Sequence, residues 1–222
     1  MKKIIPVVIV LSLMLCLVAC SGKAAPGGVS ETEVPPASET PEGTQADEAA
    51  ETEAAPAENT ASEGGVLVVF FSATGTTKGV AEKIAALENA DLYEIKAAQE
   101  YTDDDLNWHD STSRTTKEQN DSSARPEIGS EPISLEGYSK IYVGYPIWWG
   151  EEPRIMDTFA ESYDFTGKTL IPFCTSGGSG IGRSGQNLAE NAGAGNWLEG
   201  QRFSGGVSEA DLQSWIDELP LN

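Results

Sequence analysis

Three short stretches of this sequence combine residue types that could bind a phosphorylated, flat ligand. The first, residues 72–77, reads Ser-Ala-Thr-Gly-Thr-Thr and leads directly into a helical pattern. Hydroxyl groups and backbone N–H groups at a helix start bind anions. The stretch contains no lysine, unlike the GxxxxGK[ST] loop that binds nucleoside triphosphates. It therefore predicts a neutral cradle for a phosphate monoester, and the alternative is a hydroxyl that caps the helix.

The other two stretches could hold a flat ring. Residues 145–153 place two adjacent tryptophans in a loop, where they favour a planar ligand or form a hydrophobic plug beneath residues 97–137. Residues 175–184 are rich in glycine, which lets backbone N–H groups approach a ligand unless the stretch is only a flexible connection. A phosphate cradle, an aromatic edge and an amide-rich wall match the three parts of FMN.

Composition argues against several other kinds of site. The net charge of −21 repels phosphate backbones, so we expect no nucleic-acid partner. His109 is the single histidine, which argues against a multi-histidine metal site or a Ser/His/Asp triad. The three cysteines include no CxxC pair, so neither a structural zinc site nor a thioredoxin-like motif is supported. We therefore predict no metal site and assign no catalytic residue.

Alternating strand and helix patterns place these stretches at one edge of a sheet. Strands are expected at 66–71, 92–95, 140–145, 169–174 and 197–203, and helices at 77–87, 153–163, 184–191 and 208–219. This alternation predicts an α/β doubly wound sandwich with a five-stranded parallel sheet in the order 2-1-3-4-5. Ligands in such folds bind at the carboxyl ends of the strands. Residues 97–137 lack a clear period, and we expect a functional loop or a hidden short helix there.

The N-terminus reads as a targeting segment followed by a linker. Residues 1–20 have a basic start, an apolar run and the ending Leu-Val-Ala-Cys, which resembles the bacterial lipobox. That resemblance implies lipidation of Cys20, and the alternatives are an ordinary signal peptide or a retained anchor helix. Residues 21–65 are acidic and lack aromatics, so we expect a disordered tether or an acidic partner-binding tail before the domain at 66–222. We expect an exported protein, anchored to the outer face of the cytoplasmic membrane or the cell envelope.

Residues 66–218 resemble the flavodoxin family. Residues 72–77 are similar to its [S/T]-x-T-G-x-T signature, and residues 146–150 and 175–178 resemble a bacterial flavodoxin-like subfamily. The resemblance implies that the phosphate is held by Ser72, Thr74, Gly75, Thr76 and Thr77. It implies that the isoalloxazine ring is bordered by the loop Pro146, Ile147, Trp148, Trp149 and Gly150. It implies that the other edge or the ribityl chain is contacted by Thr175, Ser176, Gly177 and Gly178.

The aromatic pattern departs from the usual one in this family. Flavodoxins usually have an aromatic residue in each of two loops that flank the ring, whereas here both tryptophans lie in one loop. Trp108 or His109 could cover the ring instead, and otherwise they are surface or packing residues.

The resemblance implies an FMN-binding electron-transfer protein that serves a redox partner protein or a small acceptor. Its acidic surface would attract basic partners. The alternative is an FMN-dependent NAD(P)H:quinone-type oxidoreductase, because the Pro-x-x-Trp loop also resembles quinone reductases of the same superfamily. We favour the carrier. A receiver domain would need an aspartate after the third strand, where Tyr145 and Pro146 stand.

Overall fold

The computed structural model describes residues 64–221 of this protein. The predicted signal peptide, Cys20 and nearly all of the predicted linker lie outside the described residues. Among residues 64–221, no helix is both long enough and apolar enough to cross a membrane.

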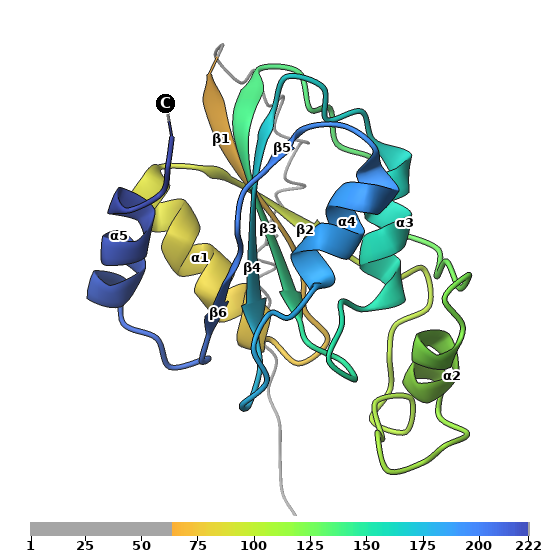
Figure 1. The fold of residues 1–222 in the computed structure, drawn as a ribbon. Coiled ribbons are helices and arrows are strands. Elements are labelled where there is room, and N and C mark those ends of the chain that lie inside the picture. Colours follow the sequence, from red (N-terminus) through yellow and green to blue (C-terminus); the bar gives the residue numbers. More distant parts are fainter. Residues whose placement is uncertain (1–63, 222) are drawn as a thin grey trace, which may run out of the picture. The chain divides into compact units, whose positions relative to one another are not determined.

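A parallel sheet forms the centre of the domain (Figure 1). Its strands are β1 (Gly65–Phe71), β2 (Asp91–Ile95), β3 (Tyr138–Pro146), β4 (Thr169–Thr175), β5 (Asn196–Trp197) and β6 (Gln201–Phe203). The order is β2-β1-β3-β4-β5, and β6 also pairs with β4. The predicted strand order and fold class are therefore confirmed. Because every pairing is parallel, the carboxyl ends of the strands share one edge.

Helices cover both faces of the sheet. They are α1 (Thr76–Glu88), α2 (Arg114–Asn120), α3 (Arg154–Ser162), α4 (Ser184–Ala192) and α5 (Glu209–Asp217). Figure 1 shows α1 and α5 on one face, α3 and α4 on the other, and α2 away from the sheet. β1 is apolar throughout because it contributes to both cores: Leu67 and Val69 pack on the α3 side, and Val68 and Phe70 on the α1 side.

The predicted fifth strand is split into β5 and β6. Trp197 pairs with Leu170 and Gln201 with Phe173, so the edge strand uses one more residue than β4 across this interval. Such an extra residue is a bulge. Pro172 lies opposite the break and has no N–H group to donate, which weakens regular pairing there.

The segment 97–137 contains the short helix α2. Ser113 caps it by accepting a hydrogen bond from the Thr116 N–H group at 3.3 Å. The buried side chains of α2 are Thr115, Thr116 and Gln119, all of them polar. Hydrophobic periodicity is therefore absent from this helix, which explains why the sequence pattern showed no period.

Candidate functional site

The loop after β1 ends in a helix start that no side chain caps. Gly75 is the N-cap residue of α1, in the left-handed conformation with φ +81°, and it makes no side-chain capping hydrogen bond. The first N–H groups of a helix lack partners within the helix, so those of α1 are available to a ligand. The hydroxyls of Thr74 and Thr76 lie 3.4 Å apart beside them. The alternative that this stretch caps its own helix is therefore wrong.

The cradle is electrically neutral apart from the helix dipole. Lys78 on α1 pairs with Glu94, with 3.5 Å between Nζ and Oε2. Lys83 on the same helix donates from Nζ to the carbonyl oxygen of Val207 at 2.7 Å. Both ammonium groups of α1 are thus engaged elsewhere, which leaves backbone N–H groups and hydroxyls to meet an anion.

Thr175, the last residue of β4, bonds to the start of α1 and to the loop after β3. Its hydroxyl lies 2.9 Å from the Thr77 hydroxyl, which links the end of β4 to the start of α1. Its carbonyl oxygen accepts from the Ile147 N–H group at 3.0 Å, which links β4 to the loop after β3. Both residues are buried, so this hydrogen bond lies in the protein interior between the loops. The loops after β1, β3 and β4 therefore converge at one edge of the sheet.

The loop after β3 contains a two-residue turn that leaves the indole of Trp149 exposed. Trp148 and Glu151 exchange backbone hydrogen bonds of 2.9 and 3.0 Å around Trp149 and Gly150. Both central residues have positive φ, +51° at Trp149 and +87° at Gly150, which is the pattern of a type I′ turn. A left-handed backbone costs a bulky residue about 1–2 kcal/mol. Trp149 tolerates this cost and remains 45% exposed.

The two adjacent tryptophans have different environments. Trp148 is half-buried and packs edge-to-face on Phe71 and Tyr101, with ring centroids 5.6 and 5.3 Å apart. Tyr101 belongs to the segment 97–137, so Trp148 packs beneath this segment as the hydrophobic-plug alternative predicts. Trp149 is not part of this aromatic cluster.

A cavity of about 370 Å³ lies between these loops. Its volume falls in the range of small-molecule sites, roughly 300–1,000 Å³. It is lined by Ser72, Ala73, Thr74, Thr76, Thr77, Leu106, Trp108, Thr115, Pro146, Ile147, Trp148 and Trp149. None of these described residues carries an ionisable group at neutral pH. The cavity has a hydroxyl-rich end and an apolar, aromatic wall, which suits a ligand with a phosphate and a flat ring.

Most of the predicted site residues meet at this cavity. Eight of them line it: Ser72, Thr74, Thr76, Thr77, Pro146, Ile147, Trp148 and Trp149. Gly75, Gly150 and Thr175 shape the surrounding backbone. The remaining three, Ser176, Gly177 and Gly178, are outside the lining, and Arg202 donates to the Ser176 carbonyl oxygen at 2.6 Å. A contact between these three residues and a ligand stays a prediction.

The segment 97–137 supplies residues to the cavity that sequence reasoning identified only in part. Trp108 lines the cavity and is 67% exposed, and the His109 ring lies against it with centroids 3.4 Å apart. His109 does not line the cavity. Leu106 and Thr115 were missed, because a lone leucine and a threonine in a polar stretch give no signal.

A buried carboxyl pair lies just beyond the turn. Glu152 and Asp157 are each 1% exposed, and Arg154 lies near both, 3.9 Å from the Glu152 carboxylate and 3.3 Å from that of Asp157. Burial raises the pKa of Glu152 to about 7, and the neighbouring Asp157 carboxylate adds to the rise. Burial also raises the pKa of Asp157, against the opposing effect of Arg154 and Arg125. Glu152 therefore retains a proton more readily than an exposed glutamate.

Comparisons with known proteins agree with this architecture. The profile of a family described as Flavodoxin matches residues 65–219. A candidate flavoprotein from Bacteroides uniformis ATCC 8492 is 45% identical, and the match covers 70% of this chain and 99% of that one with a TM-score of 0.67. One from Bacteroides eggerthii DSM 20697 is 42% identical, with 71% and 99% covered and a TM-score of 0.67.

A more distant structure shares the fold. The flavoprotein from Lactobacillus acidophilus NCFM, solved in complex with FMN, is 21% identical, with 69% of this chain and 99% of that one covered and a TM-score of 0.52. No curated protein matches the chain.

Proposed function

Because this chain belongs to the flavodoxin family, we propose that it binds FMN in the cavity between the β1 and β3 loops and transfers electrons through it. The observation that carries the proposal is the pairing of an uncapped, neutral helix start with an aromatic wall in a single cavity. A phosphate needs the first feature and a flat ring needs the second. The two Bacteroides relatives named as candidate flavoproteins support a flavin as the ligand.

The proposed roles follow from position. The N–H groups at the start of α1 and the hydroxyls of Ser72, Thr74 and Thr76 would bind the phosphate. Trp149 and Trp108, both partly exposed at the cavity, would border the ring. When bound, FMN supplies the electron-transfer chemistry.

The chain's own residues position the ring and exclude water. None of the described lining residues can donate or remove a proton at neutral pH, since all are aliphatic, aromatic, proline or hydroxyl side chains. General acid or base groups are therefore missing from the described wall of the cavity. A wall of this kind suits a carrier, in which the protein sets the position and the environment of the flavin.

The full-length chain, solubilised in detergent, tests FMN binding directly. Added FMN should lose its fluorescence at micromolar protein concentrations, and riboflavin, which lacks the phosphate, should bind much more weakly. Thr74→Val should weaken FMN binding by at least about tenfold, because a hydrogen bond to a charged group is worth about 1.5–3 kcal/mol. Thr166→Val, at an exposed threonine outside the cavity lining, is the matched control and should leave binding unchanged. Undiminished FMN fluorescence would remove the proposal.

We further propose that lipid on Cys20 tethers the domain to the membrane surface, with the stretch between Cys20 and β1 as the connecting chain. If it behaved as a random coil, a connecting chain of about 45 residues would have a root-mean-square span of roughly 35–40 Å. The domain could thus reach partners well above the bilayer. Cys20→Ala should move the protein from the membrane fraction to the soluble fraction, whereas retention of this variant in membranes would overturn the tether.

A further inference from the structure

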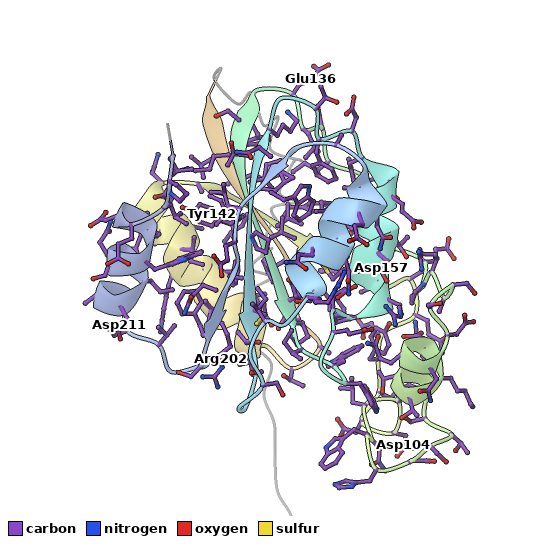
Figure 2. All side chains as sticks on the ribbon, viewed as in Figure 1. Asp104, Glu136, Tyr142, Asp157, Arg202 and Asp211 are labelled. Atoms are coloured by element: carbon purple, nitrogen blue, oxygen red, sulfur yellow. The ribbon has the colours of Figure 1, made fainter. Side chains whose placement is uncertain are left out.

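The segment between Ala98 and Glu127, here called the insert, is a closed unit beside the sheet. Its base is pinned by backbone hydrogen bonds from Ala98 to Glu127 at 2.8 Å and from Gly129 to Lys96 at 2.7 Å. Figure 2 labels Asp104 on the insert, which extends away from the sheet. The part of the insert before α2 carries Leu106 and Trp108, both of which line the cavity. The position of the insert therefore determines whether Trp108 forms a cavity wall.

Helix α2 and the turn that carries Trp108 are bonded into one body. The Thr115 hydroxyl donates to the carbonyl oxygen of Asp105 at 2.6 Å. The Thr116 hydroxyl donates to the carbonyl oxygen of Asp110 at 2.9 Å. These two bonds hold the chain on either side of Trp108, so a shift of α2 carries the indole with it.

Gln119 fastens this body to the loop after β3. Its side chain is buried, at 8% exposure, and its Nε2 donates to the carbonyl oxygens of Trp148 and Glu152, each at 3.1 Å. These two acceptors bracket the turn that presents Trp149. In return, Arg154 donates from Nη2 to the Gln119 carbonyl oxygen at 3.2 Å. An amide NH2 group carries two hydrogens, so this one uncharged group can donate to both carbonyl oxygens, which a hydroxyl with its single hydrogen could not do.

The other contacts of the insert lie nearer its base. Tyr101 packs on Trp148, and Arg125 pairs with Glu161 at 2.6 Å between Nη2 and Oε1. The Thr158 hydroxyl donates to the carbonyl oxygen of Pro126 at 2.9 Å. These contacts attach the base of the insert to the rest of the domain. Gln119, on α2, connects the part of the insert that carries Trp108 to the Trp149 turn.

We propose that Gln119 is a positioning residue that holds Trp108 and the Trp149 turn at a fixed separation, so that both indoles can enclose one flat ligand. The identity of that ligand as FMN rests on the proposed function. Gln119 does not line the cavity itself, so any effect on binding must pass through the residues it holds.

A double-mutant cycle on the full-length chain tests this inference. The variants are Gln119→Met, which keeps the length but removes both donors, Trp108→Ala, and the two together. We expect Gln119→Met to raise the Kd for FMN about fivefold, which corresponds to the net contribution of one ordinary hydrogen bond, because only part of the lost bonding reaches the ligand. In the Trp108→Ala background the same change should raise Kd less than about twofold, because the wall that Gln119 positions is already gone. Gln213→Met, at a glutamine on α5 that donates to Asp217, is the matched control and should leave Kd unchanged.

The outcomes separate the two proposals. If the unmodified chain fails to bind FMN, the proposed function falls. If it binds FMN but Gln119→Met weakens binding equally with and without Trp108, or not at all, only the positioning role is overturned. Should Gln119→Met not fold, Thr116→Val breaks the same link at its other end. That variant must then lose FMN affinity in the presence of Trp108 and not in its absence.

Discussion

Glu152→Gln should remove a large part of the pH dependence of folding in this protein. Glu152 is 1% exposed, and its carboxyl accepts from Asn187 at 3.2 Å between Nδ2 and Oε2. Glutamine has the same shape, keeps an acceptor for Asn187 and carries no charge. The substitution therefore changes titration while leaving packing nearly intact.

The magnitude follows from the shift in pKa. The pKa of Glu152 rises from 4.5 to about 7 on folding. A raised carboxyl pKa means that the folded chain binds the proton more tightly, so the group's stabilising contribution is complete below the unfolded pKa and is lost as pH rises to the folded pKa. Each pKa unit corresponds to about 1.4 kcal/mol, so the loss is about 3 kcal/mol in total and about 2–3 kcal/mol between about pH 5 and pH 8.

Urea unfolding at several pH values measures this difference. Near pH 5 the wild type and Glu152→Gln should unfold at similar urea concentrations, and near pH 8 the variant should be more stable by about 2 kcal/mol. Glu161→Gln is the control: Arg125 lowers the pKa of Glu161, so that group titrates below this range and its variant should run parallel to the wild type. Parallel curves for Glu152→Gln as well would show that this carboxyl is ionised in the folded chain throughout and would refute the reasoning.

Three further outcomes are expected. Gly75→Ala should lower the free energy of unfolding by about 1–2 kcal/mol, since φ is +81° there, and should weaken FMN binding in the same fluorescence titration; unchanged values would show that the turn tolerates a side chain. Thr77→Val should cost about 1–3 kcal/mol in urea unfolding by leaving the Thr175 hydroxyl unpaired, while adding Thr175→Val should restore part of that loss; a further drop in the double variant would argue against the pairing. Stopped-flow mixing of FMN-loaded protein with NADH or NADPH should leave the flavin absorbance unchanged, whereas dithionite should bleach it; rapid bleaching by either nucleotide would favour the reductase.

The sheet and the cradle were predictable because their signals are local. Continuous apolar runs such as 66–71 can only be buried on both faces, and their alternation with amphipathic helices leaves few topologies. The hydroxyls of the cradle stand next to the glycine that turns the chain, within a single stretch of six residues. Local chemistry of this kind is readable without coordinates.

The insert was not predictable because its contacts join distant parts of the chain. α2 buries polar side chains, so it has no hydrophobic period. Gln119 meets acceptors about 30 positions away in sequence, and nothing near it indicates this. Trp148 and Trp149 are adjacent and share the same sequence neighbours. Trp148 nevertheless packs on Tyr101, whereas the turn leaves Trp149 exposed. Such divisions depend on tertiary geometry.

At position 149, the residue that best suits the left-handed backbone differs from the residue that best suits a flat ligand. If this position were randomised and the library sorted for resistance to proteolysis, glycine and asparagine should be enriched, because both adopt positive φ readily. If the survivors were then sorted by retention on immobilised flavin, large aromatics should return. The relative enrichment in the two rounds would show how much conformational cost this turn accepts in exchange for an indole at the mouth of the cavity.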